Sequence, residues 1–457
     1  KLEMLDSIKI WRMTPEVVSD IMPFEKNIFD LVIFDEASQL YVEKSIPAIY
    51  RAKKVVVAGD QKQLKPSSLG QGRILDEIDE DEISDGFLEY ESLLDAARYK
   101  YKHTMLNYHY RSKYEELIAF SNYAFYNGKL MVTSLAQKSD EKPIERIKVE
   151  NGMWIDKKNE QEANQVVKLV KEILNRRKNN ETIGVITFNS SQMNLIEDLI
   201  EKEKMIDTNF ATKMLSEENR YSNGENISFF VKNIESVQGD ERDIIIFCIG
   251  YAKNEKGRVA INFGWLNQDG GENRLNVAIS RAKQKIYVVT SIEPEELIVD
   301  YTKNDGPKLF KQYLEYVKAL SNGQNDLVKS QLLSLLDRNE SDQQQLTFDS
   351  VFEEEVCDKL IEKGYNVETQ YGVGGYRIDL VIKSKDGKDN ILGIECDGRL
   401  YHSSKYARER DYHRQKYLES RGWKIYRIWS TNWWKNPNME IKKIIKYIEK
   451  ISSKVGD

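Results

Sequence analysis

The sequence predicts an α/β protein in which doubly wound parallel sheets, the first of them incomplete, are followed by a small α/β domain. Over the first 300 residues, short apolar runs rich in Val and Ile and bounded by Gly, Asp or Asn alternate with longer segments of helical periodicity. Such alternation is typical of parallel sheets covered by helices on both faces. After residue 346 the order changes to one helix, two strands, a second helix and a third strand, which indicates a separate domain.

The composition is that of an ordinary globular chain. Its 457 residues suggest about three domains of roughly 150 residues each. The three cysteines, Cys248, Cys357 and Cys396, are far apart and lack zinc-ligand spacing, so we expect no disulfide framework and favour a reducing cytoplasm. No apolar run approaches the ~20 residues that span a bilayer and no signal peptide is evident, so we expect no membrane partner. The sequence makes no prediction of oligomeric state.

The expected elements follow the chain in a regular order. Strands are predicted at 29–34, 54–58, 183–188, 243–249 and 285–290, with a helix at 161–177. A helical segment, 307–336, leads into a polar stretch at 337–345, of which 340–345 is the best linker candidate. The last domain is predicted to contain helices at 352–363 and 407–421 and strands at 376–383, 391–396 and 424–429.

Acidic, amide and arginine side chains follow several of these strands, at the edge where ligands gather in parallel sheets. Asp35 and Glu36 come directly after the first strand, and such a pair can hold Mg²⁺ with one acid and orient a water with the other. Gln63 follows the second strand, where it can sense a γ-phosphate. Arg111 and Arg281 can supply the positive charge that phosphoryl transfer needs, although a single arginine is more often a surface salt bridge.

The order of these motifs closely resembles that of superfamily 1 helicases, in the branch that contains the nonsense-mediated-decay RNA helicase and the replication nuclease-helicase. The resemblance covers roughly residues 11–292 and implies two RecA-like motor domains. Motifs II to VI are matched by Asp-Glu-Ala-Ser-Gln (35–39), Gly-Asp-x-x-Gln-Leu-x-Pro (59–66), Tyr-Arg-Ser (110–112), Gln-Gly-x-Glu-x-Asp (238–243) and Arg-x-Asn-Val-Ala-x-x-Arg-Ala (274–282).

The resemblance implies a role for each motif residue in the binding and hydrolysis of ATP. Asp35 would hold Mg²⁺, Glu36 would orient the attacking water, and Arg111 and Arg281 would stabilise the phosphate. The residues that would face the nucleotide are Asp35, Glu36, Gln63, Gly239, Glu241 and Arg274. Thr14 resembles a nucleic-acid contact of motif Ic, although a threonine before proline is also an ordinary helix start.

One motif of the superfamily has no counterpart in the sequence. No segment fits Gly-x-x-x-x-Gly-Lys-Ser/Thr, and Gly70 and Gly72 lack the lysine and hydroxyl that cradle phosphate and magnesium. In the superfamily this loop precedes the Asp-Glu motif. We therefore expect it to belong to an N-terminal part of the same protein, and we expect this chain alone to bind ATP weakly.

The last domain carries a cluster of acids on its expected helix and strands. Asp379 interrupts one apolar strand, and Glu395 and Asp397 close the next. A carboxylate in such a position needs a partner or a metal to offset its desolvation, and convergent carboxylates can hold the divalent ions that activate water for phosphodiester hydrolysis. The alternative for either acid alone is a capped or salt-bridged strand end. Glu353 on the first helix and His402 after the second strand complete the candidate catalytic set.

This arrangement resembles the PD-(D/E)XK nucleases, closest to the subgroup related to the very-short-patch-repair endonuclease, over roughly residues 347–436. The resemblance makes Asp379 and Glu395 ligands of Mg²⁺ or Mn²⁺ and Glu353 a supporting acid. The usual lysine two residues after the second acid is replaced by Asp397. The role of that lysine must therefore move, to His402 or Lys405, and Asp397 is itself a candidate metal ligand.

A basic, aromatic segment follows these acids. Between residues 399 and 427 there are nine Lys or Arg against three Asp or Glu, although the net charge of the chain is −6. Such a patch can bind nucleic-acid phosphates. The alternative is a charged helix face that is exposed to solvent and has no binding role. The candidate nucleic-acid contacts in this segment are Lys405, Arg408, Arg410 and Arg414.

Together these features predict a helicase–nuclease fusion that acts on DNA, and analogy with similar fusions suggests a role in anti-phage defence. The alternatives are an RNA-processing helicase–nuclease and a nucleic-acid-binding module with an inactive nuclease fold. The predicted division is a partial first motor domain (1–105), a second motor domain (106–300), a helical connector and linker (301–346) and a nuclease domain (347–457).

Overall fold

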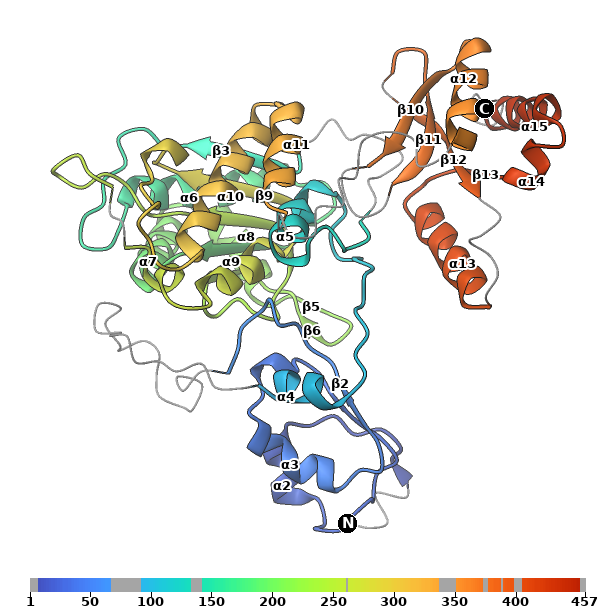
Figure 1. The fold of residues 1–457 in the computed structure, drawn as a ribbon. Coiled ribbons are helices and arrows are strands. Elements are labelled where there is room, and N and C mark those ends of the chain that lie inside the picture. Colours follow the sequence, from blue (N-terminus) through green and yellow to red (C-terminus); the bar gives the residue numbers. More distant parts are fainter. Residues whose placement is uncertain are drawn as a thin grey trace.

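The structure is a computed structural model. It describes residues 7–66, 92–132, 142–259, 262–336, 351–372, 377–387, 389–397 and 405–452, with only the backbone described for 405–411 and for 452. Figure 1 shows the N-terminal elements at the bottom, a large central sheet with its helices, and the C-terminal elements at the upper right.

The N-terminal elements form a small sheet of two parallel strands, β1 (Val32–Phe34) and β2 (Val55–Val57). Helices α2 (Pro15–Ile21), α3 (Val42–Tyr50) and α4 (Leu93–Lys100) accompany it. Both strands are shorter than the predicted 29–34 and 54–58, and Phe29, at the start of the first predicted strand, makes only an isolated bridge with Ala52. The sheet has an open face, on which Ile33 and Val56 are exposed. Among the described residues, the first sheet therefore contains two strands.

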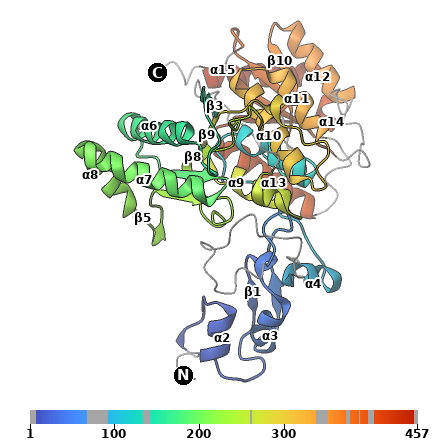
Figure 2. The ribbon, with the colours of Figure 1, turned by 90° about the vertical axis from the view of Figure 1, so that its left-hand side faces the viewer.

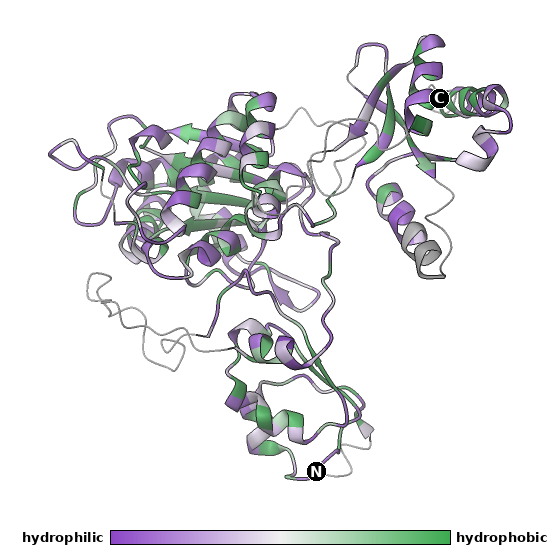
Figure 3. Ribbon diagram, in the orientation of Figure 1, coloured by the Kyte–Doolittle hydropathy of each residue, from purple (hydrophilic) through white to green (hydrophobic). Residues whose placement is uncertain are grey.

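The central sheet has five strands, all of them parallel, in the order β3-β9-β8-β4-β7. The strands are mostly apolar and coloured green in Figure 3. This confirms the predicted doubly wound parallel sheet, although β3 and β7 were not predicted. The strands are β3 (Ile144–Lys148), β4 (Ile183–Thr187), β7 (Phe230–Asn233), β8 (Arg242–Cys248) and β9 (Ala282–Thr290).

Helices cover both faces of the central sheet, as Figures 1 and 2 show. One face packs against α6 (Glu160–Arg176), α7 (Ser190–Ile206) and α8 (Thr208–Glu218). The other face packs against α5 (Glu116–Tyr126), α9 (Gly271–Ile279), α10 (Gly306–Ser321) and α11 (Asn325–Ser334). A minor hairpin joins β5 (Tyr221–Ser222) to β6 (Glu225–Asn226).

The predicted helical segment 307–336 is two helices rather than one. The helix is interrupted between α10 and α11 at Gly323. The φ of this glycine is 72°, in the left-handed region that glycine adopts at little cost. Both helices pack onto the central core, so this segment belongs to the motor rather than to a separate connector. The linker candidate 340–345 lies outside the described residues.

The C-terminal elements form a mixed four-stranded sheet in the order β10-β11-β12-β13. The first two pairings are antiparallel and the last is parallel. Strand β10 and the last helix were not predicted. The strands are β10 (Asn366–Tyr371), β11 (Ile378–Lys383), β12 (Asn390–Asp397) and β13 (Ile425–Trp429).

The helices of this unit lie on opposite faces of its sheet. One face packs against α12 (Val351–Glu362), α14 (Ser430–Trp433) and α15 (Pro437–Ser452). The other face packs against the end of α13 (Lys405–Ser420), through Leu418 and the following Trp423. Met131, from the chain that precedes the central sheet, packs against this second cluster. Among the described residues, no helix is both long and apolar enough to cross a membrane.

Candidate nuclease and motor sites

The two principal acids of the C-terminal unit stand side by side on neighbouring strands. Leu380 of β11 pairs with Ile394 of β12 in an antiparallel register, which places Asp379 opposite Glu395. Opposed residues project from the same face of a sheet. Val381, two residues beyond Asp379, packs against Leu418, so this is the face that α13 covers. The pairing predicted from sequence is therefore present.

The surroundings of both acids disfavour their ionised forms and raise their pKa values. Burial raises the pKa of Asp379 to about 7, a backbone N–H bond from Cys396 (2.7 Å) opposes this rise, and nearby Glu353 adds to it. Burial raises the pKa of Glu395 to about 8, with Arg414 opposing the rise and Asp379 adding to it. Carboxyl groups that repel one another in a dry site gain most from a shared cation.

Two arginines contact this cluster. Arg414 of α13 reaches Glu395, with Nη2 2.9 Å from one oxygen and 3.2 Å from the other. Arg427 of β13 binds Asp397 with two bonds of 2.7 Å, across the parallel pair of β12 and β13. Both oxygens of Asp397 thus accept from an arginine, and its role as a metal ligand stays a prediction.

The donor set can hold a hard divalent ion. Among the described residues no three His, Cys, Asp or Glu side chains are grouped closely enough to form a complete metal site. Mg²⁺ does not require such a group, because it is commonly held by one or two carboxylates and completes its shell with water and substrate phosphate. Asp379 and Glu395 supply two carboxylates, and buried Glu353, which accepts from Gln370 (3.1 Å), adds negative charge nearby.

Several predicted residues of this domain cannot be placed. His402 lies outside the described residues, as do the side chains of Lys405, Arg408 and Arg410. Arg414 was predicted as a nucleic-acid contact, and in the structure it binds Glu395 and the backbone oxygen of Arg377 (3.1 Å). Two residues of the predicted basic patch, Arg414 and Arg427, therefore contact the acids Glu395 and Asp397 directly.

In the motor, residues from both motor domains meet around Glu36. Glu36 has a φ of 51° directly after β1, and the side-chain amide of Gln238 donates to its carboxylate at 3.3 Å. The backbone N–H of Glu36 donates to Asp35 at 3.0 Å. Burial, helped by nearby Arg111, lowers the pKa of Arg281 to about 10, and Glu36 opposes this shift. Glu36, Arg281 and Gln238 are thus neighbours in space.

The other motif residues are held by ion pairs. Arg111 contacts Glu241 at 2.6 Å, and Lys283 reaches the second oxygen of Glu241, also at 2.6 Å. Although burial opposes ionisation, hydrogen bonds from Lys283 and Arg111 hold the pKa of Glu241 below its ordinary value. Arg274 contacts Glu235 at 2.5 Å and lies over the ring of Trp265.

A network of polar side chains joins the two motor domains. The motifs did not predict it. Asp60 accepts from Gln63 (3.0 Å) and from the hydroxyl of Tyr126 on α5 (2.6 Å). Asn276 on α9 donates to the same hydroxyl (2.9 Å) and to the backbone oxygen of Lys62 (2.7 Å). The available signal was that Asp60 and Asn276 are polar residues inside motifs III and VI.

Two further predicted site residues, Thr14 and Gly239, have local structural roles. Thr14 is the N-cap of α2 and accepts from the backbone N–H of Val17 at 3.4 Å, which is the helix-start alternative. Its contact with nucleic acid stays a prediction. Gly239 has a φ of 85°, and a Cβ there would meet no atom within 4 Å, so the constraint on this residue is conformational rather than steric.

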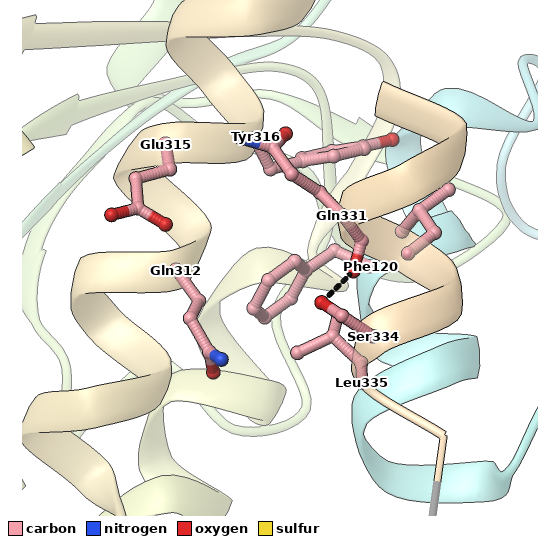
Figure 4. Close-up of a pocket in the computed structure, with 8 residues that line it drawn as sticks. Phe120, Gln312, Glu315, Tyr316, Gln331, Ser334 and Leu335 are labelled. Carbon is pink, nitrogen blue, oxygen red and sulfur yellow. Dashed lines mark hydrogen bonds between the residues drawn. The ribbon is translucent and has the colours of Figure 1, made fainter. Parts of the chain in front are cut away.

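A small pocket lies apart from both sites. It is formed between α5, α10 and α11, where Ser334 donates to the backbone oxygen of Gln331 at 2.7 Å (Figure 4). Phe120 and Tyr316 line it, and none of the motor or nuclease motif residues does.

Comparisons with known proteins identify relatives of both the motor part and the C-terminal part of the chain. Two family models described as AAA domains match residues 17–69 and 89–293, and the family model REase_MTES_1575 matches residues 352–448. The chain is 33% identical over 439 residues to the "Uncharacterized ATP-dependent helicase MG140 homolog" of Mycoplasma pneumoniae, which covers 94% of this chain and 38% of that protein. It is 34% identical over 444 residues to the MG140 helicase of Mycoplasma genitalium, with the same coverage.

A more distant relative is the "DNA polymerase alpha-associated DNA helicase A" of Saccharomyces cerevisiae, at 27% identity over 58% of this chain and 39% of that protein. The chain therefore spans less than two fifths of the length of these relatives. It contains the AAA domains of superfamily 1 helicases, followed by a C-terminal domain of the restriction-endonuclease-like type.

Proposed function

We propose that this chain combines part of an ATP-driven superfamily 1 motor with a metal-dependent nuclease that cleaves phosphodiester bonds in DNA. The observation that carries the nuclease proposal is the opposed pair Asp379 and Glu395, two buried acids with raised pKa values on adjacent strands. Although Cys396 and Arg414 contact the two acids, their pKa values stay raised because burial disfavours the charged forms, and such a pair favours a function that uses both charges.

Asp379 and Glu395 would hold a Mg²⁺ or Mn²⁺ ion, which supplies a nucleophilic water and neutralises charge on the phosphate. The chain's own residues prepare this site. The Cys396 N–H fixes one oxygen of Asp379. Arg414 presents its guanidinium beside Glu395, and because arginine stays protonated it can bind a phosphate oxygen but cannot act as a base. We assign to Arg414 the positive charge that the lysine of related nucleases provides.

The motor residues fit the roles expected for phosphoryl transfer. Glu36 projects beside Gln238 and Arg281, which come from the second motor domain. In a motor of this type, nucleotide binds between the two domains, and arginines from one domain stabilise the phosphate held by the other. We propose that Arg111 exchanges its contact with Glu241 for the γ-phosphate when the domains close.

We favour DNA as the substrate. The name of the yeast relative assigns that protein to DNA, and the nuclease resemblance is to a subgroup of DNA-cleaving enzymes. A role in anti-phage defence remains an extension by analogy with other helicase–nuclease fusions.

Cleavage assays on three substrates test this proposal. Plasmid DNA, single-stranded DNA and RNA are each incubated with the chain and Mg²⁺, Mn²⁺ or a chelator. The expected result is metal-dependent cleavage of DNA, abolished by the chelator. Cleavage of RNA alone would favour an RNA-processing enzyme, and binding without cleavage of any substrate in either metal would favour an inactive binding module.

A further inference from the structure

Helix α13 lies between the nuclease acids and the second motor domain. At one point along the helix Arg414 binds Glu395, and one turn later the hydroxyl of Tyr417 donates to the backbone oxygen of His109 at 2.9 Å. Just after the helix, Arg421 donates to the backbone oxygens of Ser112 and Lys113, each at 3.0 Å. Arg414 and Tyr417 are about one turn apart on α13, and Arg421 directly follows the last residue of the helix, so one short segment makes all three contacts.

The motor side of this contact is the segment 107–113, which carries motif residue Arg111. The segment is fixed within the motor, because the N–H of Lys113 donates to the backbone oxygen of Lys283 at 2.7 Å and Arg111 contacts Glu241. Tyr417 is buried, and its ring meets the rings of Tyr108 and Tyr110 edge-on, with centroids 5.6 and 5.5 Å away.

Tyr417 and Arg421 bind backbone oxygens of this segment rather than its side chains. Their bonds therefore depend on the path of the chain around Arg111. Apolar packing of Met131 against Leu418 and Trp423 can hold the two domains together without such bonds, since apolar contact has little directional preference. The directed bonds add a defined position for α13, and with it a defined position for Arg414.

We propose that Tyr417 and Arg421 are positioning residues of the nuclease. They hold α13 on segment 107–113 and so place Arg414 at Glu395, which makes the second motor domain part of the nuclease site. The inference rests on the proposed nuclease function. Arg111 lies in the same segment, so its contact with Glu241 and the contacts of Tyr417 and Arg421 share one stretch of backbone.

The test uses the full chain and the double substitution Tyr417→Phe with Arg421→Gln. Phenylalanine keeps the ring contacts and loses only the hydroxyl, so the domain contact through Met131 is expected to remain. The matched control is Tyr412→Phe, which removes a hydroxyl from an exposed tyrosine on the same helix. DNA cleavage is measured for kcat and KM, and Mn²⁺ binding is measured separately by calorimetry without DNA.

A loss of alignment at a reacting centre reduces turnover more than binding, so we expect kcat to fall by on the order of 10- to 100-fold while KM changes by less than about 3-fold. Glu395 loses its competing cation, so we expect Mn²⁺ to bind at least as tightly as in the parent. The control should match the parent in both measurements. A parent-like kcat in the double variant overturns the positioning role.

The calorimetric measurement of Mn²⁺ binding distinguishes a failure of the positioning role from a failure of the nuclease proposal. If the parent binds Mn²⁺ but cuts no DNA, the nuclease proposal fails, and unchanged or stronger Mn²⁺ binding in the double variant still supports the placement of Arg414. Weaker Mn²⁺ binding in the double variant contradicts that placement. If the parent binds no Mn²⁺ at all, both proposals are overturned.

Discussion

Arg414 of helix α13 and Glu395 of strand β12 form an ion pair, 2.9 Å between Nη2 and the nearer carboxylate oxygen. The pair brings a permanent cation to the second acid of the proposed nuclease motif, in which Asp397 occupies the position of the usual lysine. This position beside Glu395 is the basis for our proposal that Arg414 takes the place of that lysine.

Replacement of Arg414 by alanine should reduce DNA cleavage more than DNA binding. Removal of one charged donor from a phosphate in its transition state typically costs on the order of 100-fold in rate, so we expect kcat to fall by about that factor. Arg414→Lys should recover part of the rate, because it restores the charge without the forked geometry. Lys416→Ala, at an exposed lysine on the same helix, is the control. Equal losses in the control would assign the effect to general charge.

Metal binding should depend steeply on pH. The pKa values of Asp379 and Glu395 lie near 7 and 8, and a carboxyl must be ionised to bind metal, so apparent Mn²⁺ affinity should rise by on the order of 100-fold between about pH 6 and about pH 8. Calorimetry in buffers of different ionisation enthalpy should detect proton release on binding near pH 6. Affinity that does not change across this range would contradict the raised pKa values.

The same acids should make the metal-free chain less stable at higher pH. Their pKa values in the folded state lie above the unfolded values of about 4, so protonation favours folding. This stabilisation is complete below about pH 4 and is lost as the pH rises through about 7 to 8. Asp379→Asn should reduce this loss in urea denaturation, while Asp358→Asn, at an exposed acid of α12, should leave it unchanged.

We expect the loss of Asp397 to affect the free energy of unfolding rather than the binding of metal. Its paired contact with Arg427 is largely buried, so Asp397→Ala removes two charge-assisted bonds from this arginine and should lower the free energy of unfolding by about 3 kcal/mol. The double substitution Asp397→Leu with Arg427→Met should recover most of this loss, because an apolar pair leaves no charge unpaired. Urea denaturation measures both. Loss of Mn²⁺ binding in Asp397→Ala without loss of stability would instead make Asp397 a ligand.

Much of this site could be predicted from the sequence, and the remainder depends on long-range register. Asp379 and Glu395 each stand in an otherwise apolar strand, which identifies them as candidate site residues. The antiparallel pairing of β11 and β12 brings them together. The partners of Glu395 and Asp397 could not be predicted, because no local pattern gives the rotation of α13 or the parallel pairing of β12 with β13. Strand β10 was missed because its residues, Asn-Val-Glu-Thr-Gln-Tyr, are mostly polar.

In the motor, the motifs predicted which residues gather but not what holds them. Glu36 was expected on the nucleotide side, and a 3.3 Å bond from Gln238, a residue of motif V with no predicted role, holds it. The hydroxyl of Tyr126 lies outside every motif, so its link between Asp60 and Asn276 carried no signal in the sequence.

That hydroxyl should contribute to motor stability. Tyr126→Phe removes a hydrogen bond to a carboxylate and leaves Asn276 with one acceptor fewer, so we expect the free energy of unfolding to fall by about 2 kcal/mol. Urea denaturation followed by tryptophan fluorescence measures the change. Tyr99→Phe, at a tyrosine that is 85% exposed, is the matched control. A loss below that of the control would show that the network does not join the two motor domains.

The central claim, that Asp379 and Glu395 form a working nuclease site, is tested most directly by single-turnover cleavage of plasmid DNA with Mn²⁺. The parent chain and Asp358→Ala should cut at the same rate, and Asp379→Ala and Glu395→Ala should lose cleavage by at least about 1000-fold, since each removes a ligand of the metal. Undiminished cleavage by Asp379→Ala, or no cleavage by the parent in either metal, would contradict the account.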